Sequence, residues 1–384
     1  MEHYARRILV LAGEESGLIY AERLKDALQA ASPDAVMEFR GYQSEGFKTA
    51  DLAVMGFWPV LQRLFFFLGV ARTMKRVIRE WKPEAVVTVD YPGLNLKLAA
   101  YAKSLGIPAV HLVCPQVWAW HQGRIPKVAA ALTKLLCFFP FEPHLFRGTG
   151  LCARFIGHPL VDVFAAESHQ GARPAGQDGR PMTVALLPGS RLGEIRRILP
   201  RLLSALHMLA ANDAVCMKDV SILIPAANGR AHAEIERLVR AIPPPDEFRI
   251  EVIRGRAREI LRQADCAAVA SGTATLEAAL ARCPTVLVYA VSPLLAWFAR
   301  HAIKGVKHIG LANVIAEKTG TPPPMPELLQ EAFTPEAVAS WIGLWLSDSA
   351  AREKAAVSLD RTMAHLKSDG DAIGNAAREI LSCI

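Results

Sequence analysis

The sequence lacks any uninterrupted apolar run of the ~20 residues that a membrane-spanning helix requires. Its N-terminal stretch enters a strand-like run with no signal-peptide cleavage site, so we expect a cytoplasmic protein. The seven cysteines are scattered, with no Cys-x-x-Cys pair and no metal-like Cys/His spacing, which argues against a disulfide framework or structural zinc. Asp and Glu number only 37 against 44 Lys and Arg, and the net charge of +7 favours an anionic partner such as a nucleotide, a nucleic acid or an acidic lipid surface.

Short β-rich apolar runs alternate with longer helical patterns, which predicts an α/β protein with parallel sheets. Strands are expected at 7–13, 35–41, 85–90, 108–113 and 134–139, and then at 183–187, 220–225, 249–253, 266–270 and 285–290. The polar, Gly- and Pro-rich segment 168–182 predicts a linker. We therefore expect two Rossmann-like domains, 1–167 and 183–333, facing a central cleft, with C-terminal helices over 334–384.

A Pro-Gly-Ser-Arg turn follows the first apolar run of the second half and opens a helix. Gly189, Ser190 and Arg191 form this turn. A helix N-terminus carries unsatisfied N–H donors and partial positive charge, so a glycine turn with an arginine at this place suits a phosphate. The alternative is an ordinary strand-to-helix turn with a surface arginine.

A second turn of this kind follows the expected strand 266–270. Ser271, Gly272 and Thr273 stand at the strand end, and Glu277 lies one turn into the next helix. Small residues let backbone N–H groups approach a phosphate, and a glutamate at that depth can bind both hydroxyls of a ribose. Two anion-binding turns in one domain favour a nucleotide diphosphate.

One carboxylate closes an apolar strand in the first half. Asp90 ends the expected strand 85–90 and precedes a Pro-Gly turn. A carboxylate at the carboxyl end of a parallel strand faces the ligand crevice and can act as a general base. The alternative is that Asp90 caps the following helix.

Further candidates for the acceptor side lie in the loops of the first half: Glu14, Ser16, Asn95, Trp118, Trp120 and Arg124. The first glycine turn has Gly-x-x-x-Gly rather than Gly-x-Gly-x-x-Gly, which disfavours a dinucleotide. Ser16 can equally cap a helix. The two tryptophans suggest a wall for sugar or acyl groups, or alternatively core packing.

A dense apolar cluster within 55–76 is flanked by basic residues and suits a helix lying in the interface of an anionic membrane. Its apolar candidates are Phe57, Trp58, Phe65, Phe66, Phe67 and Leu68. A helix buried in its own domain is the alternative. The one Asp-x-Asp, at Asp369 and Asp371, lies beside a C-terminal helix, so we predict no metal and no cofactor.

Distinctive motifs run along most of the chain, among them "AGEESG", "KPEAVVTVDYPGLN", "QVWAWHQGRIPKV", "FPFE", "FIGHPL", "ALLPGSRLGEI" and "ASGTATLEAALARCP". In these motifs the sequence resembles the lipid-A-disaccharide synthase family, bacterial glycosyltransferases of the GT-B fold. The resemblance implies transfer from UDP-2,3-diacylglucosamine to 2,3-diacylglucosamine 1-phosphate, with inversion and without metal. It also implies that Asp90 is the catalytic aspartate and that the two turns of the second half bind UDP.

The resemblance further implies a peripheral protein on the cytoplasmic surface of the inner membrane, with two acylated sugar substrates, no nucleic acid and a possible homodimer. The first half departs from the family pattern, for example at Leu18, Gly93, Cys114 and Gln116. Two alternatives therefore stand beside the transferase. One is an isomerase of the UDP-N-acetylglucosamine 2-epimerase type, and the other is a non-catalytic homologue that binds lipid or nucleotide.

Overall fold

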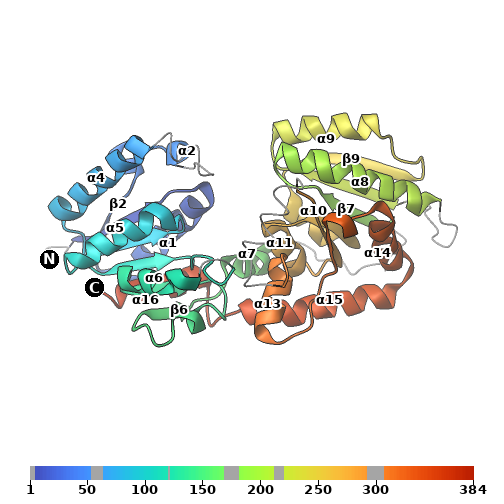
Figure 1. The fold of residues 1–384 in the computed structure, drawn as a ribbon. Helices are drawn as coiled ribbons and strands as arrows, with labels where there is room; N and C mark the ends of the chain where they lie inside the picture. Colours follow the sequence, from blue (N-terminus) through green and yellow to red (C-terminus); the bar gives the residue numbers. More distant parts are fainter. Residues whose placement is uncertain (1–4, 53–63, 120–121, 168–180, 212–219, 292–306) are drawn as a thin grey trace. The chain divides into compact units, whose positions relative to one another are not determined.

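The computed structural model describes the chain except for residues 1–4, 53–63, 120–121, 168–180, 212–219 and 292–306 (Figure 1). The chain divides into two compact units, and each is described by itself. The first unit comprises Met1–Asp162 and Leu366–Ile384, and the second comprises Val163–His365. The chain thus passes between the units before the expected linker 168–182, of which only the last two residues are described, and it returns to the first unit near its end.

The first unit has a six-stranded parallel sheet in the order β2-β1-β3-β4-β5-β6 (Figure 1). Its strands are β1 Ala5–Ala12, β2 Val36–Arg40, β3 Ala85–Val89, β4 Ala109–Leu112, β5 Lys134–Cys137 and β6 Cys152–Phe155. The five expected strands are present, whereas β6 was not predicted. This edge strand is short and half exposed, so it carries no apolar run.

Helices cover both faces of this sheet. They are α1 Glu15–Ala31, α2 Thr49–Leu52, α4 Leu64–Trp81, α5 Pro92–Ser104, α6 Ile125–Ala131, α7 Pro159–Glu167, which runs on into the second unit, and α16 Ala372–Leu381. Alternate residues of β1 point to opposite faces. Ile8 and Val10 therefore pack against α1 and α16, whereas Leu9 and Leu11 pack against α4, α5 and α6.

The second unit repeats the architecture, with a parallel sheet in the order β12-β11-β10-β7-β8-β9. Its strands are β7 Thr183–Leu187, β8 Val220–Ala226, β9 Phe248–Arg254, β10 Cys266–Ala270, β11 Thr285–Tyr289 and β12 Glu327–Leu329. Its helices are α8 Leu192–Ala210, α9 Gly229–Ala241, α10 Ala257–Gln263, α11 Thr273–Leu280, α13 Leu311–Thr319, α14 Pro335–Ser347 and α15 Ser349–Met363. Core residues of α8, α9 and α14 form one cluster with the sheet, and α11 contacts α10, α13 and α15.

The last helix differs from the other C-terminal helices in its partner. We expected helices over 334–384 and named no partner for them. In the structure α14 and α15 pack in the second unit, whereas α16 packs on α1. Ile373 and Ile380 are buried in that contact. Lys134 at the start of β5 donates to Glu379 Oε2 at 2.8 Å, which ties the helix to the first sheet. An amphipathic stripe shows that a helix packs, but it does not specify the partner.

Candidate active site

A pocket of about 720 Å³ lies at the carboxyl ends of β7, β8, β9 and β10 in the second unit. We call it the β7–β10 pocket. β7 and β10 are neighbours in register, with Leu187 opposite Val269, so the turns that follow them lie side by side. Six of the seven residues expected to bind a nucleotide line this pocket: Gly189, Ser190, Ser271, Gly272, Thr273 and Glu277. The structure thus brings both predicted anion turns to one cavity.

The turn after β7 requires a glycine. Gly189 has φ +104°, and a Cβ at this position would lie 2.7 Å from Oε2 of Glu194. Glu194 also accepts from the backbone N–H of Arg191, which is the N-cap of α8. The Arg191 guanidinium pairs with Oε1 of Glu194 at 3.2 Å, and its side chain is 69% exposed. Arg191 is not among the residues that line the β7–β10 pocket, so it lies beside the turn that it was expected to complete.

The turn after β10 leads into α11. Gly272 has φ +150°, and no atom lies within 4 Å of a Cβ built there, so its backbone borders open space. Burial raises the pKa of Glu277, and the nearby Arg258 guanidinium, 3.7 Å away, opposes this shift. The side chain of Glu277 is thereby held at the pocket wall, one turn below the helix N-terminus.

Three arginines of the pocket escaped the sequence analysis: Arg256, Arg258 and Arg262. They follow β9 in the segment "GRAREILR". Arg258 and Arg262 both pair with Glu167, at 3.3 and 2.9 Å. A Gly-Arg step directly after a strand was the available signal. Arg256 pairs with Glu259 at 2.7 Å, so each of the three guanidiniums contacts a glutamate of the lining. A guanidinium in such a pair can bind a diphosphate by exchanging the carboxylate for phosphate oxygens.

In the first unit, Asp90 lines a second cavity of about 430 Å³, the Asp90 pocket, together with Pro92, Gln116 and Arg124 among others. Asp90 and Tyr91 have φ +48° and +51°, so the chain turns sharply as it leaves β3. Oδ1 of Asp90 accepts from the Tyr91 N–H at 2.8 Å. The N-cap of α5 is Tyr91 and not Asp90. The geometry therefore favours a carboxylate presented to a cavity over the capping alternative.

The surroundings of Asp90 raise the pKa of its carboxyl group. Burial raises the pKa of Asp90, and the Tyr91 N–H partly offsets this. Glu14 follows β1, the strand next to β3, and its pKa is raised by burial and by the charge of Asp90. A raised pKa makes each of these two neighbouring carboxylates a stronger base than an exposed one, which suits proton transfer.

Asn95 lies beneath this turn and is fully buried. Its Nδ2 donates to the carbonyls of Leu11, Val89 and Asp90, and its Oδ1 accepts from the Tyr42 hydroxyl at 2.7 Å. The amide is thus committed to holding the ends of β1 and β3 together. Asn95 positions Asp90 and does not face the acceptor side as expected.

Trp118 is also buried, with 5% exposure. Its Nε1 donates to Oε1 of Glu142 at 3.2 Å, and its ring packs edge-on against Phe141. Trp118 therefore packs in the core, as the alternative predicted, and is not among the residues that line the Asp90 pocket. Trp120 and the side chain of Ser16 lie outside the described residues.

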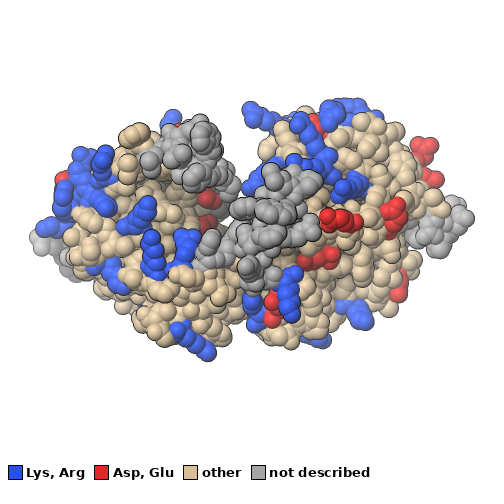
Figure 2. Space-filling model, in the orientation of Figure 1, with Lys and Arg blue, Asp and Glu red and all other residues tan. Residues whose placement is uncertain are grey.

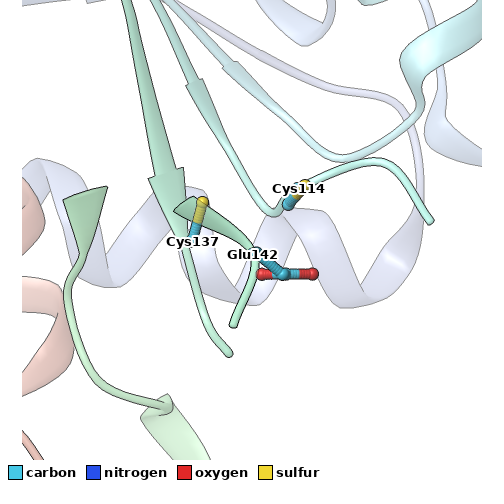
Figure 3. A group of neighbouring side chains, drawn as sticks. All are labelled: Cys114, Cys137 and Glu142. Carbon is cyan, nitrogen blue, oxygen red and sulfur yellow. The ribbon is translucent and has the colours of Figure 1, made fainter. Parts of the chain in front are cut away.

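Cys114, Cys137 and Glu142 form a buried cluster beside the Asp90 pocket (Figure 3). One ligand atom of each lies within 4.8 Å of the others, a spacing that a metal ion can occupy. A hydrogen bond with Cys137 and then burial raise the pKa of the Cys114 thiol, and burial raises the pKa of Cys137. Burial also raises the pKa of Glu142 to about 8. Both Glu142 oxygens already accept N–H bonds, from Trp118 and from Phe139. The raised pKa values favour the protonated groups, and the two N–H bonds already engage the Glu142 oxygens, so the arrangement favours a hydrogen-bonded cluster over a metal centre.

Of the apolar residues of α4 that were expected at the membrane, some are exposed and others pack in the core. Phe65 is 87% exposed and Leu68 41% exposed, whereas Phe66 and Phe67 pack against the core, Phe66 edge-on to Phe47. Phe57 and Trp58 lie outside the described residues. Figure 2 shows Lys and Arg gathered over α4, α5 and α6. Within the described residues, no helix has both the length and the apolar character to cross a membrane.

Comparison with known proteins identifies the family. A family model described as lipid-A-disaccharide synthetase matches residues 8–380. The lipid-A-disaccharide synthase of Anaeromyxobacter dehalogenans is 36% identical over 98% of this chain and 97% of its own length. That of an Azoarcus species is 37% identical over 90% and 88%.

Solved structures show the fold. MurG of Acinetobacter baumannii matches with a TM-score of 0.58 at 14% identity, over 98% of this chain and 99% of its own. A putative UDP-N-acetylglucosamine 2-epimerase from Listeria monocytogenes matches with 0.59 at 11%, over 98% and 95%. The second likeness shows the fold alone and does not favour the isomerase alternative. The expected GT-B architecture is confirmed, and the chain belongs to the lipid-A-disaccharide synthase family of hexosyltransferases.

Proposed function

We propose that this hexosyltransferase joins UDP-2,3-diacylglucosamine to 2,3-diacylglucosamine 1-phosphate, forming the β-1,6-linked disaccharide 1-phosphate and UDP. One observation carries the proposal: this member of the family has both a base-like carboxylate and a pocket lined by arginines. The carboxylate lies at the end of β3, and the pocket lies at the ends of β7 and β10. The first suits an acceptor hydroxyl, and the second suits a nucleotide diphosphate.

The β7–β10 pocket binds the UDP portion of the donor. Backbone N–H groups at Ser190 and Thr273, at the N-termini of α8 and α11, point their partial positive charge toward the diphosphate. Arg256 and Arg258 add full charges, and Glu277 accepts from the ribose hydroxyls. These groups stabilise the negative charge that develops on UDP as the bond to the sugar breaks.

Asp90 accepts the proton of the acceptor's 6-hydroxyl while that oxygen attacks the anomeric carbon. The bond between that carbon and the UDP oxygen breaks on the opposite face, so the configuration inverts. Asp90 is held for this by its own turn and by Asn95, which binds the Asp90 carbonyl at 2.7 Å. Because burial raises its pKa, Asp90 is a stronger base than an exposed aspartate.

Phe65 and Leu68, with the exposed basic residues of α4, dock the enzyme on an anionic membrane surface, where both acylated substrates reside. We therefore propose a cytoplasmic enzyme that associates peripherally with the inner membrane. Two further predictions from the sequence remain predictions: that the protein forms a homodimer, and that its domains span 1–167 and 183–333.

Product analysis of the full chain tests the proposal. The purified protein is incubated with UDP-diacylglucosamine, with and without diacylglucosamine 1-phosphate, and the products are measured by mass spectrometry. We expect UDP release and a disaccharide 1-phosphate only when both acylated sugars are present. A C2-epimerised sugar nucleotide formed without acceptor would instead indicate the isomerase, and no UDP release would indicate a non-catalytic homologue.

A further inference from the structure

A third cavity, of about 360 Å³, lies between α5 and α6 of the first unit. We call it the α5–α6 groove. Its α5 side is formed by Pro92, Gly93, Leu96, Lys97 and Ala100, and its α6 side by Arg124, Lys127, Val128, Ala130 and Ala131. We propose that this groove holds an acyl chain of the acceptor while the acceptor's phosphate is bound at its cationic rim.

The groove and the Asp90 pocket are neighbours. Pro92 and Arg124 line both cavities, so the two lie next to each other at the N-terminus of α5. Pro92 follows Asp90 by two positions, which places the start of the groove next to the carboxylate. An acceptor whose 6-hydroxyl meets Asp90 can therefore extend from the Asp90 pocket into the groove without leaving the first unit.

The floor of the groove suits a hydrocarbon chain. Leu96, Ala100, Val128 and Ala131 give it small and apolar walls. The lining residues of α5 recur at helical spacing along one side of the helix, from Pro92 to Ala100. At 1.5 Å per residue this side is ~12 Å long. A groove of this length buries a run of methylene groups, each of which favours burial.

The rim of the groove suits an anion. The lining residues include Lys97, Arg124 and Lys127 and no acidic residue. All three basic residues are exposed, and Figure 2 shows that Lys and Arg side chains lie over α5 and α6. Positive charge beside an apolar floor complements a molecule with a phosphate and an acyl chain. Arg124, which lines both cavities, is the residue that we assign to the phosphate.

The inference rests on the proposed function, and its test varies the acyl chain. Ala100 is exposed on α5 and lines the groove, so Ala100→Phe fills the groove without replacing a buried side chain. Ala30→Phe, on the exposed end of α1, is the matched control. Initial rates are measured in detergent micelles with acceptors that carry tetradecanoyl or butanoyl chains.

We expect Ala100→Phe to raise KM for the tetradecanoyl acceptor about tenfold, because burial of roughly two methylenes is lost, and to change KM for the butanoyl acceptor less than twofold. The value of kcat stays close to the parent, and Ala30→Phe leaves both KM values unchanged. Equal effects of Ala100→Phe on the two acceptors would overturn the proposal. Ala100→Leu, which adds less volume, gives a graded effect and serves if the larger variant fails to fold.

Two further outcomes are distinguishable. A parent enzyme that forms no disaccharide contradicts the proposed function, whereas an active parent whose Ala100→Phe variant shows no chain-length effect contradicts only the groove. Sedimentation with anionic phospholipid vesicles separates substrate binding from membrane docking. Loss of vesicle binding by Ala100→Phe, with unchanged KM in micelles, would assign the groove to the membrane and overturn the acceptor subsite.

Discussion

Nη1 of Arg191 lies 3.2 Å from Oε1 of Glu194, which stands three residues later in the first turn of α8. The pair connects the N-cap of the helix to its N3 position and leaves the guanidinium largely in solvent. An exposed pair of this kind adds little to stability. This arrangement places Arg191 beside the turn after β7, where we expect the guanidinium to exchange the carboxylate for a phosphate if a nucleotide binds.

Replacing Arg191 by alanine is expected to weaken UDP binding by roughly 1.5–3 kcal/mol, the usual worth of a charge-assisted hydrogen bond. Isothermal calorimetry measures the affinity. Arg196→Ala is the matched control, because Arg196 is on the same helix, is exposed and pairs with Glu234 outside the pocket lining. Affinity that is unchanged in Arg191→Ala would assign the diphosphate to Arg256 and Arg258 alone.

Two glycines, one in the turn before α8 and one in the first turn of α8, are expected to respond in opposite ways to alanine. Gly189→Ala places a Cβ 2.7 Å from Glu194 at φ +104°, so we expect a loss of about 1–3 kcal/mol in stability together with weaker UDP binding. Gly193 lies within α8 with no atom within 4 Å of a built Cβ, so Gly193→Ala is neutral or stabilises by about 0.5–1 kcal/mol. Thermal unfolding with and without UDP checks both. If the two variants had the same stability and the same UDP affinity, Gly189 would not have the positive φ that the structure gives it.

Glu142 should make stability depend on pH. Burial raises its pKa to about 8, well above the value of 4.5 expected in the unfolded chain. Between these values the unfolded chain releases a proton that the folded protein keeps, so stability is full below about pH 4.5 and falls as pH rises toward 8. The slope is at most about 1.4 kcal/mol per pH unit.

The measurement compares thermal unfolding of the parent and Glu142→Gln at pH 5 and pH 8. Glutamine keeps an oxygen for the Trp118 or Phe139 N–H but has no proton to release. The parent is expected to lose more stability than the variant over this range. A parallel dependence in both proteins would show that Glu142 is ionised when buried.

Local turns could be predicted from the sequence because their signals are local. Gly189 and Gly272 each follow an apolar strand and open a helix, and strand ends of a parallel sheet meet at one edge. The arginines after β9 were missed because nothing in their own segment shows that β8 and β9 lie next to β7. Their role depends on strand order, which the sequence does not state.

The role of buried polar residues was harder to predict from the sequence than the turns were. Asn95 and Trp118 stand in loops or helix starts near the expected site, which made them candidates. Their partners, Tyr42 and Glu142, are 53 and 24 positions away in the chain. Whether such a side chain faces a ligand or a partner is decided by tertiary contacts, and no pattern within one segment contains that information.

The exposed and the buried apolar residues of α4 should respond differently to substitution. Serine at Phe65 and Leu68, which are exposed, is expected to release the protein from anionic liposomes while the melting temperature stays close to that of the parent. Phe66→Ser is the contrasting variant. Because Phe66 packs against Phe47 and the core, it should lower stability. Liposome flotation and thermal unfolding are measured on both. Flotation that persists in the Phe65 and Leu68 double variant would remove α4 from the membrane contact.

Asp90→Asn should lower turnover by roughly 10²- to 10⁴-fold, because asparagine fills the same space but cannot accept the acceptor's proton. UDP affinity and thermal stability should stay close to the parent, since Asn can still accept the Tyr91 N–H through its side-chain oxygen. The parent's kcat/KM is expected to fall as pH decreases through the raised pKa of Asp90, because the protonated carboxyl is no longer a base. The Asn variant's residual rate should lack that dependence.

Glu14→Gln is the control, since Glu14 shares the electrostatic environment of Asp90 but does not line the Asp90 pocket. Full activity in a well-folded Asp90→Asn enzyme, with the loss appearing in Glu14→Gln instead, would move the base to Glu14.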